Sequence, residues 1–185
     1  MSKILMFVAN GFEEIEAVTI IDILRRSDIE CVICSITGEL LIEGSHNIKI
    51  IADVLLKDMK IEELSESFDA VVLPGGIPGA DTLRDDERVI DILNSFNSKG
   101  KITAAICAAP KVLERAGILM GKKVTFFPES IENESLLLYT GGSVEQDGTV
   151  ITGKAAGAAA EFAFLLVRQL RNGEESDRIK KVMFY

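Results

Sequence analysis

The sequence lacks long hydrophobic runs, and positive charge is in the minority. No apolar stretch among its 185 residues comes near the about 18 residues that a membrane-spanning helix requires. The opening residues, MSKILMFVANG, pass straight into a strand pattern without a secretory cleavage site, which predicts an intracellular, cytoplasmic protein. The formal net charge of −9 would repel nucleic-acid phosphates, so we expect neither a nucleic-acid nor a membrane partner.

Cysteine is also scarce, with one residue each at positions 31, 34 and 107. Three cysteines without a signal peptide do not indicate a disulfide framework. Cys31 and Cys34 have C-x-x-C spacing, but the surrounding ECVICSI is a strand pattern. Residues three apart on a strand point to opposite faces, roughly 10 Å apart, so we expect both to fill the core rather than to form a redox pair.

Histidine occurs once, at His46, in the turn GSHN. A cysteine–histidine–acid triad needs an imidazole that can reach the nucleophile, and the sequence after Cys107 contains none. We expect His46 to be a solvated turn residue. A single histidine without a ligand cluster makes a zinc site improbable, and the sequence has no P-loop, so we expect neither a metal nor a cofactor.

The elements that are present alternate between strands and helices along one domain covering residues 1–185. Strand patterns are predicted at residues 3–9, 30–36, 68–73, 102–108, 123–127 and 149–153, with a hairpin or two short strands at 39–53. Helices are predicted at residues 12–28, 81–100, 109–119 and 155–173, the last ended by Gly173. This order predicts an α/β fold with a mostly parallel sheet and helices on both faces.

Sites in such sheets form beyond the carboxyl ends of the strands. Three segments meet this description: ANGFEE, LPGGIPGA and CAAP. Cys107 begins the last of them, at a strand-to-helix turn that favours an unusual backbone conformation. The positive end of the following helix favours a reactive thiolate there, although a buried small hydrophobe would fit the local pattern equally well.

The glycines of LPGGIPGA permit backbone geometries in which N–H groups point at a developing negative oxygen. The alternative is a tight turn that needs glycine for its shape alone. A dinucleotide site is a weaker interpretation, because the spacing is G-G-x-x-G and no acidic ribose partner is in position.

Glu16 lies on an apolar stripe of the first predicted helix. Its companions at helical spacing are Phe12, Thr19, Ile20 and Ile23. A carboxyl in such a stripe is expensive without a partner, and burial would raise its pKa so that it can remain protonated. By contrast, Glu13 and Glu14 are expected to be solvated acids of the first turn.

Together these segments resemble the DJ-1/PfpI (ThiJ) superfamily, and within it the DJ-1-like branch. The matching motifs are GFEEIEAV, VVLPGG, AAICAAP and EFAFLLV, and the likeness runs in order from about Lys3 to Leu170. The resemblance implies a flavodoxin-like three-layer sandwich and a homodimer built partly through the first helix. It also implies that Arg26 lies near the dimer seam, where it and His46 could together hold an anion.

The resemblance implies that Cys107 is a reactive cysteine, that Glu16 is its protonated partner, and that Gly76 and Ala108 offer N–H groups to an oxygen beside the sulfur. The implied activity is cofactor-independent glyoxalase III or protein deglycase chemistry on 2-oxoaldehydes or glycated substrates. The alternative is a redox-sensing, stress-protective, chaperone-like dimer whose cysteine is oxidised to sulfinate. Phe127 stands where the family has a histidine, and Ala108 stands where its protease branch has one, so a protease is not expected.

Overall fold

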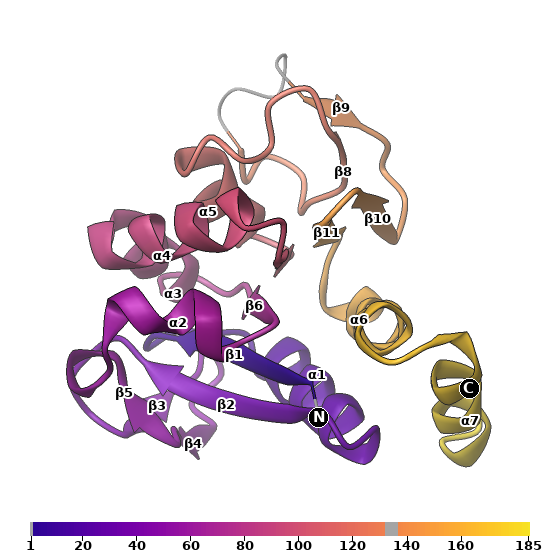
Figure 1. Cartoon of the computed structure of the whole chain (residues 1–185). Helices are drawn as coiled ribbons and strands as arrows, with labels where there is room; N and C mark the ends of the chain where they lie inside the picture. Colours follow the sequence, from indigo (N-terminus) through magenta and orange to yellow (C-terminus); the bar gives the residue numbers. More distant parts are fainter. Residues whose placement is uncertain (1, 132–136) are drawn as a thin grey trace.

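The structure, a computed structural model, describes residues 2–131 and 137–185. Within these ranges, helices cover both faces of a seven-stranded sheet with the order β10-β11-β7-β6-β1-β2-β5 (Figure 1). The strands are β1 (Lys3–Val8), β2 (Glu30–Ser35), β5 (Val54–Leu55), β6 (Ala70–Leu73), β7 (Ile102–Ile106), β10 (Val144–Asp147) and β11 (Val150–Gly153). Every pairing is parallel except that of β10 with β11. The predicted flavodoxin-like sandwich is confirmed.

The core is divided by the sheet into two apolar clusters. One face carries α1 (Glu14–Arg26), α6 (Ala159–Leu170) and α7 (Gly173–Val182), and the other carries α2 (Ile61–Ser67), α3 (Gly79–Asp85), α4 (Glu87–Ser98) and α5 (Pro110–Arg115). Successive residues of β1 serve opposite clusters: Phe7 packs with the α2–α5 layer and Met6 with the α1–α6 layer, both fully buried. A strand covered on both faces has no polar side, which explains the uninterrupted apolar run of β1.

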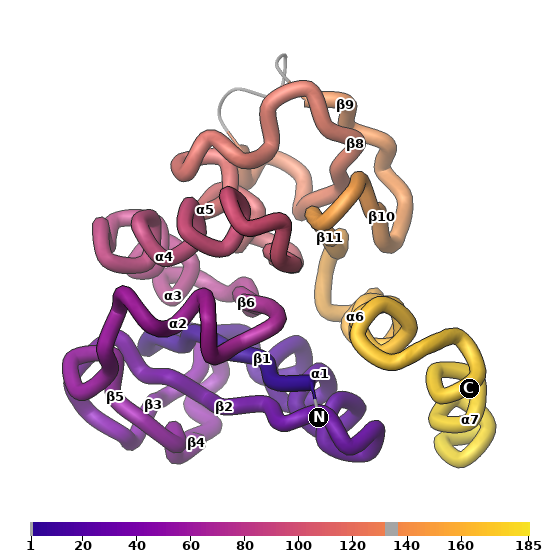
Figure 2. The backbone as a smooth tube through the Cα atoms, viewed as in Figure 1, coloured from indigo at the N-terminus to yellow at the C-terminus, as the bar shows by residue number. Residues whose placement is uncertain are grey.

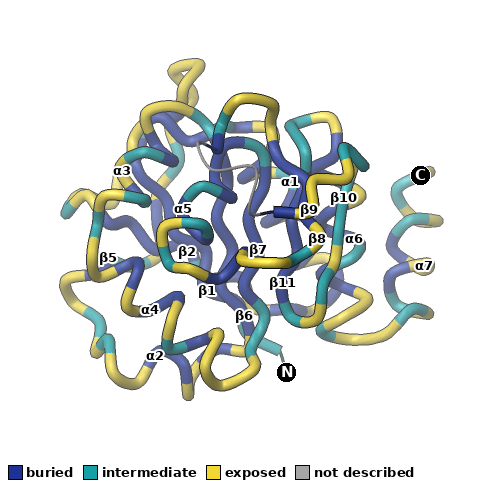
Figure 3. Tube along the Cα trace, turned by 90° about the horizontal axis from the view of Figure 1, so that it is seen from above, coloured by how far each residue is buried: buried dark blue, intermediate teal, exposed yellow. Residues whose placement is uncertain are grey.

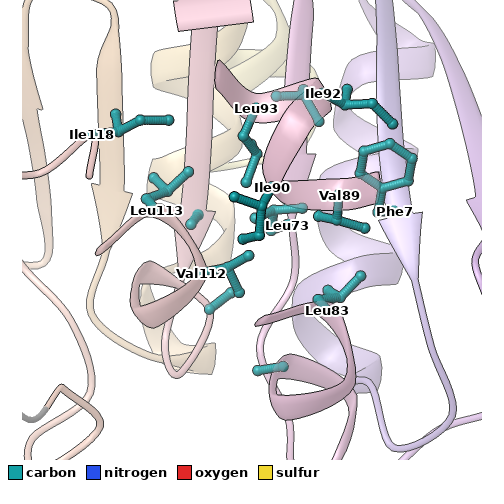
Figure 4. Packing of buried hydrophobic residues seen from close by; sticks show 14 of the residues in the cluster. Phe7, Leu73, Leu83, Val89, Ile90, Ile92, Leu93, Val112, Leu113 and Ile118 are labelled. Atoms are coloured by element: carbon teal, nitrogen blue, oxygen red, sulfur yellow. The ribbon is translucent and has the colours of Figure 1, made fainter. Parts of the chain in front are cut away.

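Figure 4 shows how the second layer meets the sheet: Val89, Ile90 and Leu93 of α4 converge with Val112 and Leu113 of α5 over the central strands. The burial-coloured trace places the buried residues along these strands and the exposed ones mainly on the outer turns (Figure 3). Following the chain in Figure 2, α7 comes last and lies beside α6, away from β1 and β2. None of the helices in the described ranges could span a membrane.

The two strand cysteines lie on opposite sides of β2. Cys31 belongs to the cluster under α1 and α6, and Cys34 belongs to the cluster under α2 to α5. Both are free thiols with at most 2% exposure, and burial raises the pKa of each to about 12. The interpretation of both as core residues is confirmed.

Three predicted helices are wrong in their extent. The segment 109–119 is helical only over Pro110–Arg115, and the other two differ more. The segment 81–100 is two helices, α3 and α4, because Asp86 takes an extended conformation (φ −92°, ψ 106°) and its side chain accepts the N–H of Arg88 as an N-cap. At the other end, α6 stops at Leu170 after a short 3₁₀ turn at Ala156–Ala158. Gly173 therefore begins α7 rather than ending a helix, because Asn172 caps the N–H of Glu175.

The strand predicted at residues 123–127 is much shorter in the structure. Only Lys123–Val124 forms β8, which pairs with β9 (Leu138–Tyr139) in a separate small sheet. The next residues bond outside any ladder: the N–H of Thr125 donates to Thr152 Oγ1, and that of Phe127 donates to the Cys107 carbonyl. The hairpin predicted within residues 39–53 is present as β3 (Leu41–Glu43) and β4 (Lys49–Ile51).

Candidate active site

The three predicted segments meet at one edge of the sheet, because β1, β6 and β7 are adjacent parallel strands. We name them the opening loop (residues 10–13, after β1), the glycine loop (residues 75–78, after β6) and the elbow (residues 107–109, after β7). The opening loop is tied to the glycine loop by the N–H of Glu13, which donates to the Gly75 carbonyl at 2.9 Å. The sequence placed all three segments at the carboxyl ends of strands, and the strand order of the sheet makes them neighbours.

Cys107 has the unusual backbone that its position predicted. Its φ of +63° lies in the left-handed region, which is rare for a residue with a side chain. The strain is held from both sides, since its N–H donates to the Gly153 carbonyl at 2.8 Å and its carbonyl accepts the N–H of Phe127 at 2.9 Å. The side chain is half-buried, so the sulfur is neither sealed in the core nor fully solvated.

Glu16 is completely buried, and its carboxyl reaches across to the elbow. Its Oε2 accepts the N–H of Gly75 at 2.8 Å, while no hydrogen-bond donor in the described ranges satisfies the buried Oε1. The carboxyl and the Cys107 side chain lie on the same side of Gly75, and each shifts the pKa of the other. The structure thus brings these two predicted site residues together.

Burial raises the pKa of Glu16 to about 7, although the Gly75 N–H and the Cys107 side chain pull in the opposite direction. Burial and the negative charge of Glu16 raise the pKa of Cys107 to about 12. The expectation that the elbow by itself favours a thiolate is therefore wrong. The helix that follows, α5, has only six residues, and its dipole is outweighed by desolvation and by the nearby carboxylate.

The two ionisations are coupled: above about pH 7 the pair carries one negative charge, which lies mainly on Glu16 and opposes ionisation of the thiol. When Glu16 holds the proton, its repulsion of a thiolate disappears and its O–H can donate to the sulfur. The N–H groups of Gly76 and Ala108 act on the sulfur as donors and lower the pKa of Cys107. The resemblance implied that both residues offer N–H groups to an oxygen bound beside the sulfur, and Gly76 has a φ of +91° that favours glycine.

The two predicted basic residues do not form a joint anion site. His46 Nδ1 lies 2.9 Å from Glu14 Oε2, and Arg26 Nε lies 2.6 Å from Asp22 Oδ2. These carboxylates belong to the first turn of α1 and to its C-terminal half. Each base therefore has its own acidic partner.

The interpretation of Glu14 as a solvated acid is also wrong. Its side chain is only 5% exposed. Sequence reasoning missed this residue as well as the N–H of Gly75, and the only available signal for the latter was the glycine pair in LPGG.

The sequence profile of the DJ-1/PfpI family matches residues 2–169. This chain belongs to the DJ-1/PfpI family. It is 34% identical to the Drosophila melanogaster protein dj-1beta over 186 residues, covering 98% of this chain and 96% of that protein. It is 33% and 35% identical to the Arabidopsis thaliana DJ-1 homologs A and B, but it spans less than half of their lengths, 46% and 39%.

Solved structures of DJ-1/PfpI family members are similar over the whole chain. The crystal structure of Drosophila melanogaster DJ-1beta superposes with a TM-score of 0.88 at 32% identity, covering all of this chain and 98% of that one. An oxidized Toxoplasma gondii DJ-1 superposes with a TM-score of 0.89 at 33% identity, covering 100% and 99% of the two chains. The likeness supports the DJ-1-like branch within the DJ-1/PfpI family.

Proposed function

We propose that this DJ-1-like protein acts on 2-oxoaldehydes, free or as glycated adducts, by cofactor-independent glyoxalase III or protein deglycase chemistry. The observation that carries the proposal is the fully buried Glu16, with its pKa raised to about 7, beside the half-buried Cys107. A carboxyl whose pKa is near the working pH can both donate and accept a proton, which is what a general acid–base must do. The cysteine supplies the nucleophile.

The reaction balances without an external oxidant or reductant. Glu16 takes up the thiol proton as the Cys107 sulfur adds to the aldehyde carbon, and it then gives this proton to the resulting alkoxide oxygen, which completes a hemithioacetal. Glu16 then carries a proton from that carbon to the neighbouring carbonyl carbon through an enediol, which leaves the thioester of a 2-hydroxy acid. Water hydrolyses the thioester, releasing the 2-hydroxy acid and restoring the thiol.

The oxygen bound to the former aldehyde carbon becomes negative as the sulfur adds. In this mechanism the N–H groups of Gly76 and Ala108 stabilise that oxygen. Loss of one such donor typically reduces the rate by about 10²–10³-fold. In this mechanism Gly76 and Ala108 therefore bind the oxygen and transfer no proton.

The direct test is to incubate the protein with methylglyoxal and measure lactate by NMR. The native chain should form lactate, while Cys107→Ala should form none and Glu16→Gln should be slower by about 10²-fold or more. Cys34→Ala, which removes a fully buried thiol of β2, is the matched control and should retain native turnover. A native chain that forms no lactate contradicts the proposal.

A second candidate function is oxidation sensing through Cys107. Phe127 favours it, because this function needs no imidazole at that position. One peroxide molecule converts the thiolate to sulfenate and a second converts it to sulfinate, each being reduced to water. A protonated Glu16 would donate a hydrogen bond to a sulfinate oxygen and stabilise that state. One similar protein, from Toxoplasma gondii, has been solved in an oxidized form.

We also propose that the active form is a homodimer built partly through α1. Ile15 and Val18 on this helix are 60% and 46% exposed. Ile15 also lines a groove of about 680 Å³ that α1 forms with α6 and the C-terminal Tyr185. Sedimentation velocity should show a dimer for the native chain and a monomer for Ile15→Glu. A native monomer at micromolar concentration contradicts this assembly.

A further inference from the structure

Glu14 holds a turn of the β3–β4 hairpin through both of its carboxylate oxygens. We name residues 44–48 the clasped turn. Glu14 Oε1 accepts the N–H groups of His46 at 2.6 Å and Ile48 at 3.4 Å. Its Oε2 lies 3.2 Å from the Ser45 hydroxyl and 2.9 Å from His46 Nδ1. A buried carboxylate with this many donors is a strong anchor, since hydrogen bonds to charged groups are the stronger kind.

The Glu14 side chain is closely packed against the backbone of Gly44 in the clasped turn. A β-carbon added at Gly44 would overlap the Glu14 side chain. The side chain therefore sits directly against the backbone of the turn, and a change on either side displaces the other.

The clasped turn is joined to the opening loop, and the opening loop is joined to the glycine loop. The N–H of Ser45 donates to the Phe12 carbonyl at 2.8 Å. One residue further on, the N–H of Glu13 donates to the Gly75 carbonyl at 2.9 Å. A β-carbon at Gly76 would overlap the backbone of the opening loop, so these two loops are also in direct contact. The contacts run without a gap from Glu14 to the N–H groups that face Glu16 and Cys107.

We propose that Glu14 is a positioning residue that acts through the clasped turn on the Glu16–Cys107 pair. It keeps the opening loop pressed against the glycine loop, so that the N–H of Gly75 stays on Glu16 and the N–H of Gly76 stays on the sulfur. The inference rests on the proposed function only for its consequence in turnover, because its direct effect is on the ionisation of the pair. Neither atom of Glu14's carboxylate touches the reacting groups.

The charges around Glu14 support this role. The hydrogen bonds from the clasped turn outweigh burial and lower the pKa of Glu14 to about 2, so it is a carboxylate at neutral pH. The same contact raises the pKa of His46, with a smaller contribution from Glu13. Elsewhere on the hairpin, Lys49 Nζ pairs with Glu43 Oε2 at 3.2 Å and not with Glu14.

The test measures the rate at which iodoacetamide alkylates Cys107 in the folded protein as a function of pH. Mass spectrometry quantifies the alkylated protein. This readout requires no 2-oxoaldehyde turnover, so failure of the proposed function does not decide it. When the N–H groups of Gly75 and Gly76 move away, they no longer stabilise the negative charge of the Glu16–Cys107 pair. The pair then ionises at higher pH. Glu14→Ala should raise the alkylation midpoint by about one pH unit, which is about tenfold less thiolate at pH 7.

Two further variants change the clasped turn and leave Glu14 in place. Gly44→Ala should raise the midpoint in the same direction, because its methyl group displaces Glu14. The double variant Ser45→Ala/His46→Ala trims two exposed side chains, keeps the backbone donors and should give a smaller rise. Asp22→Asn, which removes an acid paired with a base elsewhere on α1, should leave the midpoint unchanged.

Thermal unfolding identifies variants that fail to fold. If Gly44→Ala and the double variant both alkylate with the native midpoint, Glu14 has no positioning role and the proposal is overturned, whether or not Glu14→Ala folds. A shift in these variants together with no lactate from the native chain would keep the positioning role and reject the 2-oxoaldehyde reaction.

Discussion

Glu16 and Cys107 approach the same point in space from two different elements: a β-carbon built on Gly75 would lie 2.8 Å from Glu16 Oε2 and 2.8 Å from Cys107 Cβ. Only a residue without a side chain can occupy position 75 while the carboxyl from α1 and the elbow after β7 face each other. The glycine loop thus forms the floor of the site and donates an N–H to each member of the pair.

Gly75→Ala should separate this pair. The added methyl group must displace the Glu16 carboxyl or the elbow, and such overpacking destabilises a fold by about 1–3 kcal/mol. We expect slower alkylation of Cys107 and slower formation of lactate, with a lower melting temperature. Gly157→Ala is the control, because a β-carbon there meets nothing within 4 Å. Native alkylation in Gly75→Ala would show that the pair does not depend on this contact.

Glu16→Gln should change how stability depends on pH. The folded state raises the pKa of Glu16 from 4.5 to about 7, so the folded protein binds this proton more tightly than the unfolded chain. The resulting stabilisation, about 3 kcal/mol, is fully present below pH 4.5 and is lost as the pH rises through about 7. Relative to native, Glu16→Gln should therefore become more stable across this window. Urea unfolding at several pH values measures it, with the exposed Glu62→Gln as a flat reference.

Phe127→His should increase turnover if the proposed reaction is correct. The backbone N–H of this residue donates to the Cys107 carbonyl, and a change of side chain leaves that bond in place. An imidazole beside the elbow adds a general acid–base, which typically contributes about 10²–10⁴-fold. Lactate formation should rise, while Phe184→His, at a 97% exposed aromatic near the C-terminus, should not change it. An inactive native chain with an active histidine variant would favour oxidation sensing as the natural role.

Mild peroxide should oxidise one cysteine selectively. The pKa of all three thiols is raised to about 12, so access to peroxide decides which one reacts: Cys107 is half-buried, whereas Cys31 and Cys34 are 2% and 0% exposed. Peptide mass spectrometry should find two added oxygens at Cys107 and none at the other two. Glu16→Leu removes the carboxyl that would bind the sulfinate and should reduce the doubly oxidised form. Comparable oxidation at all three thiols would reject a sensing role.

Much of the architecture was predictable because it is recorded in local patterns. Apolar runs alternating with amphipathic segments predicted the layers, and the switch from strand to helix at Cys107 predicted an elbow. Glu16 stood out because one carboxyl interrupted an apolar stripe at helical spacing. The break at Asp86 was missed, although an aspartate that can cap a helix is a local signal, because the same residue is also compatible with the middle of a longer pattern.

What the sequence determined by itself was the order of elements, the placement of Cys31 and Cys34 on opposite faces of a strand, and the identity of the residues at the strand ends. These follow from the spacing of apolar residues, which repeats every two residues in a strand and every 3.6 in a helix, and from the order of the elements along the chain. Only the tertiary structure decided that Glu14 is buried against a turn more than 30 residues away, that Gly75 lies against both Glu16 and Cys107, and that the thiol pKa is raised. Burial and charge proximity arise when distant segments pack together, and no local pattern records which groups will share that space.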